Sequence, residues 1–548
     1  MYQAAPRTDI TPRWFRTWKL PLAIWAAAGA FVAFVALNDE TLFPDGGWRS
    51  LMYMSAVGGT VLLTSAWFGL LSTYPKKVRQ FVVGAELAAV GLFFATRRIE
   101  KVENGNIGFF TTVWRWSKPA DYQLEKLKAE KTDEQGSLPG LADYSAFLGP
   151  NRHAVVTDIK LARDWEKQPP RKLWRHSIGA GWSAFSVVGT AAVTQEQRGD
   201  EELVVCYDVP TGKVRWAHAD AARFESILGG HGPRATPTIQ DGRVYTIGST
   251  GILNCLDLAT GKALWKTRNV IEDVGSTLDL EGKAVQWGRA GSPLIVDDRV
   301  ILPGGGAPLP SALEGKYVSL IAYDKNTGEK VATGGNQQIS YSSPSQFTLD
   351  GVRQIVIMNE ATITGHDAET LKTLWSYPWP GGSSNASTPQ TQQIASDTLF
   401  VSKGYGIGAA VFKVVRGDKS TAPWKVTEVW HNPQVLRTKF TNCVLAGDHV
   451  FGLDDGTLEC VDLATGTKLW KSGRYGSGQI LLAGDVLLVQ AESGEVVLVE
   501  DNSKKFSELT RFPAIEGKTW ADPTLAGRYL LTRNAEEAAC YELPVVEE

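Results

Sequence analysis

The sequence predicts an all-β ring of eight blades, a β-propeller, preceded by three helices long enough to span a membrane. Two observations support this prediction. A short sequence pattern recurs throughout the C-terminal part of the chain, and three long apolar runs lie before residue 98. An internal repeat with a period of roughly 40 to 50 residues is typical of propellers and solenoids.

The recurring pattern is a small residue, an Asp two positions later, and a Trp eight positions after the Asp. Most copies carry Thr-Gly in between, which supplies the positive φ of a tight hairpin between two strands. The third copy has Ala332 in place of the Trp. The motif acids of the five clear copies are Asp208, Asp257, Asp324, Asp367 and Asp462.

Degenerate copies extend the count to eight. They lie at 411–413 with Trp430, at 497–499 and at 540–542. A second hairpin, marked by Gly or Asp turns, precedes each copy, and two hairpins make a four-stranded blade. The last copy lacks a fourth strand, whereas residues 171–177 form a Trp-bearing strand without a preceding hairpin. We expect this strand to complete the last blade, which would leave the ring without open edges; the alternative is that Trp174 belongs to a linker.

The N-terminal part predicts three membrane spans, at about residues 20–37, 51–71 and 79–98. These lengths suit a hydrocarbon core of about 30 Å, and a cleaved signal peptide would explain only the first run. The predicted domains are therefore a membrane anchor at 1–98, a juxtamembrane segment and linker at 99–144, and the propeller at 145–548. Within the linker, residues 106–116 are aromatic enough to lie along the membrane surface, and 119–131 predict a short charged helix.

Basic residues predict the orientation. They gather before the first span and between the second and third spans, where Lys76, Lys77 and Arg79 lie. The positive-inside rule then places the N-terminus in the cytoplasm and the propeller outside. We expect a multi-pass protein of the inner (cytoplasmic) membrane with its propeller in the periplasm. Arg97, Arg98 and Lys101 oppose this orientation, but two other segments favour it.

Charge and cysteine usage narrow the possible functions. The chain has 56 basic and 59 acidic residues without a basic stripe, so we expect no nucleic-acid partner. Four cysteines occupy the small position two residues before the motif acid, which predicts packed free thiols rather than disulfides. These residues are Cys206, Cys255, Cys460 and Cys540.

The repeat, written Ala/Cys-x-Asp-x-x-Thr-Gly-Lys-x-x-Trp, resembles the Trp-docking motif of propellers of the pyrroloquinoline quinone (PQQ) type. That superfamily includes quinoprotein alcohol and glucose dehydrogenases and the outer-membrane assembly lipoprotein BamB. The resemblance covers roughly residues 145–545. The segments 147–152, 182–186 and 231–237 also resemble membrane-anchored, BamB-like proteins of the planctomycete type. The resemblance implies the fold but no particular activity, because the motif is structural throughout the superfamily.

Two function classes follow from this resemblance. The first is a membrane-tethered, non-catalytic binding or scaffold module in the cell envelope; the alternative is a PQQ-dependent dehydrogenase of alcohols or sugars. The dehydrogenase needs calcium, which prefers several oxygen ligands, yet Asp522 is the one carboxylate in the loops expected to line the central funnel. We therefore lean towards a protein without catalytic residues, metal or cofactor.

The candidate ligand-binding residues come from the loops before the first strand of each blade. Their cations would suit an anionic small ligand or an acidic loop of an envelope protein partner. They could equally donate to carbonyl groups around the channel. The candidates are His231, Arg234, Arg289, Tyr341, Asn385, Lys439, Asn442, Arg474, Gln479, Trp520 and Asp522.

Overall fold

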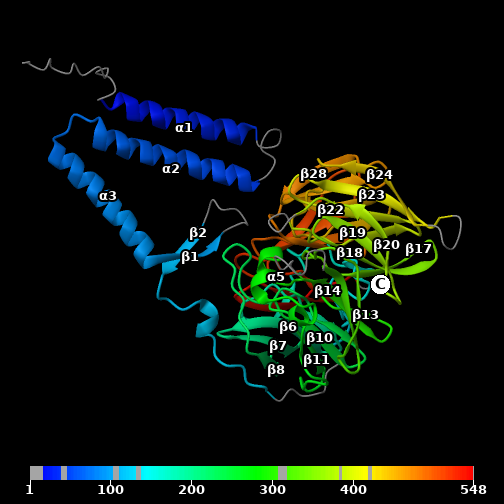
Figure 1. The fold of residues 1–548 in the computed structure, drawn as a ribbon. Coiled ribbons are helices and arrows are strands. Elements are labelled where there is room, and N and C mark those ends of the chain that lie inside the picture. The colour runs from blue at the N-terminus through cyan, green and yellow to red at the C-terminus, as the bar shows by residue number, and fades with distance from the viewer. Residues whose placement is uncertain are drawn as a thin grey trace, which may run out of the picture. The chain divides into compact units, whose positions relative to one another are not determined.

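The structure is a computed structural model that describes residues 17–38, 46–102, 110–130, 138–306, 317–381, 386–417 and 423–546. The chain divides into two compact units, Met1–Ser117 and Lys118–Glu548. The first unit contains the long helices and a two-stranded sheet, and the second contains the ring of sheets (Figure 1).

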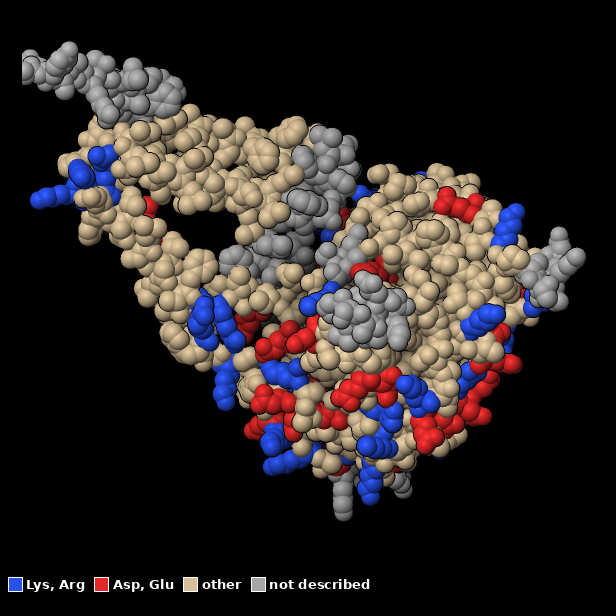
Figure 2. Space-filling model, in the orientation of Figure 1, with Lys and Arg blue, Asp and Glu red and all other residues tan. Residues whose placement is uncertain are grey.

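Three helices of the first unit are long and apolar enough to cross a membrane: α1 (Lys19–Leu37), α2 (Gly46–Leu70) and α3 (Lys76–Thr96). Helices α1 and α2 lie side by side, and the Trp25 indole donates to Thr64 Oγ1 at 3.2 Å. At the α2–α3 corner, Arg79 donates to the carbonyls of Gly69 and Leu70. Few charged side chains lie along these helices in Figure 2, as a lipid environment requires.

The segment after α3 differs from the sequence prediction. Strand β1 (Arg97–Val102) begins directly after α3 and pairs antiparallel with β2 (Phe110–Trp114). The third helix therefore ends at Thr96. The charged helix predicted at 119–131 is reduced to one 3-10 turn, η3 (Ala120–Gln123), because an isolated helix this short is marginal in water.

Eight sheets in the described residues form the propeller, as the sequence predicts. In blades 1 to 4 the strands run in chain order from the innermost outwards, and two short helices, α4 (Val270–Asp273) and α5 (Leu278–Ala284), lie between blades 2 and 3. The strands are β5 (Ser186–Val188), β6 (Ala191–Arg198), β7 (Glu201–Asp208) and β8 (Val214–Asp220) in blade 1; β9 (Thr238–Gln240), β10 (Arg243–Ile247), β11 (Ile252–Asp257) and β12 (Arg268–Asn269) in blade 2; β13 (Leu294–Val296), β14 (Arg299–Gly305), β15 (Val318–Asp324) and β16 (Lys330–Gly334) in blade 3; and β17 (Ser345–Leu349), β18 (Val352–Met358), β19 (Thr362–Asp367) and β20 (Thr373–Pro378) in blade 4.

Blades 5 to 8 continue the ring. Blade 7 gains a parallel strand, β3 (Val155–Val156), and blade 8 takes its outer strand, β4 (Arg171–Ser177), from the segment that precedes blade 1. The remaining strands are β21 (Gln392–Ala395), β22 (Thr398–Lys403), β23 (Gly408–Val415) and β24 (Lys425–Asn432) in blade 5; β25 (Val444–Ala446), β26 (His449–Asp454), β27 (Thr457–Asp462) and β28 (Lys468–Arg474) in blade 6; β29 (Gln479–Ala483), β30 (Val486–Gln490), β31 (Glu495–Glu500) and β32 (Glu508–Pro513) in blade 7; and β33 (Thr524–Ala526), β34 (Tyr529–Arg533) and β35 (Glu537–Glu542) in blade 8.

Each motif Trp docks on the following blade. The Trp216 indole N–H donates to the carbonyl of Leu258 at 2.8 Å, and Trp430 donates to Leu463 at 2.9 Å. The turn glycine of the following blade lies beneath the ring. A Cβ on Gly466 would come within 2.6 Å of Trp430, so only glycine fits there without displacement.

The junctions after blades 3 and 4 depart from this rule, and Trp470 of blade 6 donates to the Asn502 carbonyl in a turn without a glycine. Ala332 replaces the Trp of blade 3, and the following turn carries Leu371 where other turns carry glycine. Leu371 is fully buried and packs in the same cluster as Ala332, so the Leu side chain occupies the space of the missing indole. Trp375 precedes a blade without a Thr-Gly turn, and its N–H donates to Gln354 Oε1 of its own blade at 2.6 Å.

The seventh copy lies one residue later than the sequence suggests. Leu498, not Val497, faces the Trp position, which is occupied by Thr510. Trp165 contacts this strand instead. Its backbone N–H donates to Thr510 Oγ1 at 3.2 Å, and its ring packs edge-on against Phe512.

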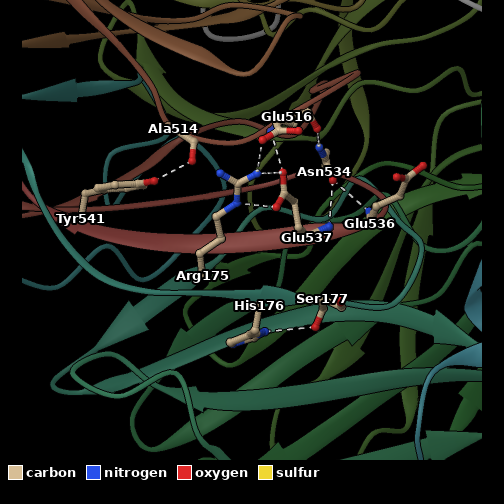
Figure 3. Close-up of polar contacts among 9 residues, drawn as sticks. All are labelled: Arg175, His176, Ser177, Ala514, Glu516, Asn534, Glu536, Glu537 and Tyr541. Carbon is tan, nitrogen blue, oxygen red and sulfur yellow. Dashed lines mark hydrogen bonds and ion pairs between the residues drawn. The ribbon is translucent and has the colours of Figure 1, made fainter.

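Strand β4 closes the ring by pairing with β35, with Trp174 opposite Cys540, as expected from the incomplete last repeat. Arg175 reinforces the pairing through two hydrogen bonds to the Glu537 carboxylate, at 2.6 and 2.9 Å (Figure 3). A third bond, of 3.2 Å, joins Arg175 to Glu516 in the loop before blade 8. All five cysteines are buried free thiols, as predicted for four of them.

Candidate binding surface on the loop face

The ring has two different ends. Each innermost strand begins at the end that carries the long loops between blades, which we call the loop face. Each innermost strand ends in a tight turn at the opposite end, which we call the turn face. In blade 1, for example, β5 begins after the loop at 178–185 and ends at the turn around Gly189.

Residues 143–156, which we call the axial segment, lie across the ring. Tyr144 exchanges two backbone hydrogen bonds with Val187 of β5, at 2.8 and 2.9 Å. The carbonyl of Ser145 accepts from Ile239 in β9, and the carbonyl of Ala154 accepts from Leu482 in β29. A single stretch of chain therefore contacts the innermost strands of blades 7, 1 and 2, which lie within four consecutive blades of the closed ring.

Side chains of the axial segment reach two further blades. Arg152 is buried, and its guanidinium donates to the carbonyls of Pro293 at 2.9 Å and Ser292 at 3.3 Å. Burial lowers the pKa of Arg152 to about 10. The ring of His153 stacks on Phe347 in β17. Because Asp143 also accepts from Gly189 N at the turn, the segment enters from the turn face.

An aromatic cluster lies at the loop face. It consists of Trp182, Phe440 and Trp520, which precede the innermost strands of blades 1, 6 and 8, and all three are half-buried. The ring centroid of Trp520 lies 5.1 Å from that of Trp182 and 4.7 Å from that of Phe440. Lys518 Nζ lies 3.6 Å from the Trp520 centroid, a cation–π contact.

Polar groups hold this cluster in place. The Trp520 indole donates to Glu492 at 2.8 Å, and the Trp182 indole donates to the carbonyl of Gly229 at 2.7 Å. The amide nitrogen of the buried Gln479 donates to the carbonyls of Phe440 and Trp520. Its Oε1 has no hydrogen-bond partner among the described residues, so Gln479 retains an acceptor beside the aromatic cluster.

Exposed apolar residues adjoin the aromatic cluster. Ile227 and Leu228 are 53% and 42% exposed, and they directly precede Gly229, to which Trp182 is bonded. Further round the loop face, Trp287 contacts Tyr341 with 5.3 Å between ring centroids. Isolated exposed apolar residues are ordinary, but a contiguous group beside aromatic rings is typical of an interaction site.

Two of the predicted cations make contacts inside the protein. Arg234 donates to the carbonyls of Gly229, Gly230 and Gly232, and burial lowers its pKa to about 10. Arg289 is 4% exposed; it donates to Pro303 and Gly304 and pairs with Glu281 at 2.6 Å. These contacts match the alternative that the cations satisfy carbonyls around the channel.

The other candidates are dispersed. Lys439 pairs with Asp455 at 3.4 Å, and Asn442 Oδ1 accepts from Gln390 N at 2.9 Å. Arg474 is exposed at the end of the outer strand β28, away from the innermost strands. His231 is half-buried, and burial lowers its pKa. Asn385 lies outside the described residues.

The structure therefore brings the predicted Gln479 and Trp520 together with Lys518, a cation of the same predicted funnel loop, and adds Trp182 and Phe440, which were not among the candidate residues. Both added residues lie in or beside the loops before the innermost strands. Because the candidate residues were chosen mainly for their charge, they did not include the aromatic residues that recur just before the innermost strands. Their spacing along the chain does not reveal that blades 6, 8 and 1 meet at one place.

The described residues contain no group of three or more His, Cys, Asp or Glu side chains that could hold a metal ion. Burial raises the pKa of Asp522 to about 7. Glu492 is engaged by the Trp520 indole and by Ser477 N.

The fold and the docked Trp residues define an eight-bladed propeller of the PQQ-like class. The family model described as outer membrane protein assembly factor BamB matches residues 166–332 and 312–508, more than half of the chain. The protein belongs to this family. No curated protein matches the chain.

Solved structures match the chain at low sequence identity. BamB from Moraxella catarrhalis is 16% identical, with a TM-score of 0.47, and the match covers 68% of this chain and 100% of that one. The quinohemoprotein alcohol dehydrogenase from Comamonas testosteroni is 13% identical, with a TM-score of 0.49, and the match covers 74% of this chain and 81% of that one.

Proposed function

We propose that the protein is a membrane-tethered, non-catalytic propeller that binds another protein of the cell envelope through its loop face. The anchor comprises α1, α2 and α3, and the propeller acts as a binding module or scaffold in the periplasm. The aromatic cluster with its apolar neighbours is the observation that carries the proposal. Trp and exposed aliphatic side chains at a surface are the usual anchors of a protein interface.

The contacts of the basic residues favour a protein partner over an anionic small ligand. Arg234 and Arg289 are occupied by carbonyls and by Glu281. The groups that face the surface are mainly apolar: Trp182, Phe440, Trp520, Ile227 and Leu228.

The axial segment supports a one-sided binding surface. Because residues 143–156 cross the turn face, a partner has access to the innermost loops from the loop face. The long loops there differ from blade to blade, whereas the tight turns of the opposite face repeat. Loops positioned by a rigid scaffold are the common location of binding residues.

Photocrosslinking tests this proposal. A photoreactive residue replaces Leu228 in the full chain, in membranes of the natural host, and Lys372 is replaced in a matched control. Lys372 is exposed in a turn between β19 and β20. We expect a discrete protein adduct from position 228 and none from 372. Trp520→Ala should weaken the adduct by about tenfold or more if Trp520 anchors the partner; equal adducts from both positions would contradict the proposal.

An activity assay distinguishes this binding function from the alternative of a dehydrogenase. The purified chain, incubated with PQQ and calcium, should not reduce a redox dye with alcohols or aldoses. Calcium-dependent turnover that is lost in Asp522→Ala would favour the dehydrogenase instead.

A further inference from the structure

The β1–β2 sheet and the residues that follow it are rich in basic side chains. Its strands and the residues that follow, 97–102 and 110–118, contain five basic residues and one acidic residue, Glu100. Strand β1 starts one residue after the end of α3, so it cannot lie far from the membrane surface if α3 spans the bilayer. Charged side chains gather at both ends of α3 in Figure 2, including the end where β1 begins.

The side chains of the sheet combine aromatic rings with positive charge. Arg97 lies opposite Trp114 in the strand pairing, with its guanidinium carbon 4.1 Å from the ring centroid. Trp116 stacks on Trp114 at 5.3 Å, and the two rings are 69% and 45% exposed. Trp at the boundary of a span is typical of the headgroup layer, where an apolar ring and a polar N–H are both accommodated.

Backbone contacts orient the remaining guanidinium groups. Arg98 donates to the carbonyl of Ser117 at 2.9 Å. Arg115 donates to the carbonyl of Phe94, in the last turn of α3, at 2.8 Å. Among the described residues, the contacts of Arg97, Arg98 and Arg115 are with carbonyls and an aromatic ring rather than with carboxylates. Their positive charge is therefore not neutralised within the described residues.

We propose that the β1–β2 sheet lies in the headgroup layer and binds anionic phospholipid through Arg97, Arg98 and Arg115. This inference rests on the membrane tether of the proposed function. It also accounts for the basic residues that oppose the positive-inside rule at this end of α3. They remain outside because the headgroup phosphates of the outer leaflet neutralise them. Exposed Trp114 and Trp116 favour a lipid surface over free phosphate, which offers no apolar layer.

A spin label in the full chain tests the proposal. Thr111→Cys places one exposed cysteine in β2, and the five native cysteines are buried, so the label attaches at a single site. The labelled chain is reconstituted in nanodiscs of phosphatidylcholine, with and without phosphatidylglycerol. We expect phosphatidylglycerol to shield the label from an aqueous nickel chelate. Inorganic phosphate added to phosphatidylcholine discs should give no shielding.

Charge variants identify the residues responsible. Each basic residue gives a roughly fivefold preference for an anionic surface, so Arg98→Gln with Arg115→Gln should raise the phosphatidylglycerol content needed for half-shielding markedly. Arg98→Lys with Arg115→Lys retains the charge and should keep the shielding. Lys262→Gln with Lys372→Gln, in exposed propeller turns, should also keep it.

Two results would overturn the proposal: equal accessibility of the label in both lipid mixtures, or shielding that the Gln variants retain. Failure of the membrane tether gives a different result, because the chain would then not enter the nanodiscs.

Discussion

At the scale of single residues, four junctions between blades follow one steric rule. At these junctions a docked Trp lies over a glycine in the turn of the next blade, where a Cβ would collide with the indole; the Cβ of Gly261, for instance, would come within 2.4 Å of Trp216. Where the Trp is lost, at Ala332, a Leu occupies the glycine position despite a φ of 57°. The two positions therefore form one packing unit and should change together.

This rule predicts the outcome of a double substitution. Gly466→Leu alone should destabilise the propeller by about 3 kcal/mol, because the side chain collides with Trp430 and the turn has φ of 67°. Trp430→Ala alone should cost about 2 kcal/mol through lost packing. The double variant should cost less than the sum by more than about 1 kcal/mol. Unfolding of the full chain in detergent measures this coupling, and simple additivity would contradict it.

A buried carboxylate predicts a pH dependence. Glu202 is 5% exposed and accepts from Ser249 N, and burial raises its pKa to about 7. The folded state therefore favours the neutral acid. Its contribution to stability is complete below the unfolded pKa of about 4.5 and is lost as the pH rises through 7.

Glu202→Gln should remove this dependence. Relative to the natural chain, the variant should gain stability between pH 5 and pH 8, by at most about 3 kcal/mol. Unfolding of both proteins at the two pH values measures the gain. A stability difference that stays constant across this range would show that Glu202 does not titrate as inferred.

At the scale of elements, the closing strand β4 depends on Arg175. The Arg175 guanidinium is 28% exposed and bonds both oxygens of Glu537, which raises the pKa of Arg175. Arg175→Gln should lower stability by about 1–2 kcal/mol, because the bidentate pair is partly shielded from water. Arg171→Gln, on the same strand, is the control; its side chain is 68% exposed, and its loss should cost under about 0.5 kcal/mol. Equal effects of the two variants in thermal unfolding would contradict this role of Arg175.

The sequence predicts most of the elements but fewer of the contacts between them. The period of the Asp, Thr-Gly and Trp pattern predicts the blades, and the unpaired strand around Trp174 predicts the closure, because both signals are local. The axial segment was not predicted. Its contacts join residues such as Arg152 and Pro293, which are far apart in the chain and share no pattern. The aromatic cluster was not predicted for the same reason, since Trp182 and Trp520 are far apart in the chain and meet only because the ring closes.

At the scale of the whole molecule, the axial segment joins blades that are distant along the ring. Arg152→Ala should destabilise the propeller by about 2–3 kcal/mol, because the buried side chain leaves a cavity and the Ser292 carbonyl loses its donor, whereas the Pro293 carbonyl keeps the Thr238 hydroxyl. Asn151→Ala is a matched control at an exposed neighbouring position and should change stability by under about 0.5 kcal/mol. Thermal unfolding and protease resistance of the full chain measure both. If Arg152→Ala unfolds at the same temperature as the natural chain, the contacts of Arg152 do not contribute to the stability of the propeller.

The anchor determines on which side of the membrane the binding surface acts. Lys76, Lys77 and Arg79 lie at the start of α3, and the positive-inside rule predicts that this end is cytoplasmic. With α3 crossing once more, the rule predicts an exported propeller. A reporter that is active only in the cytoplasm should therefore be inactive when fused after Glu548. A cysteine introduced at exposed Lys372 should react with an impermeant maleimide in spheroplasts, because the native cysteines are buried. An active reporter together with an unreactive Cys at 372 would place the propeller, and its loop face, in the cytoplasm.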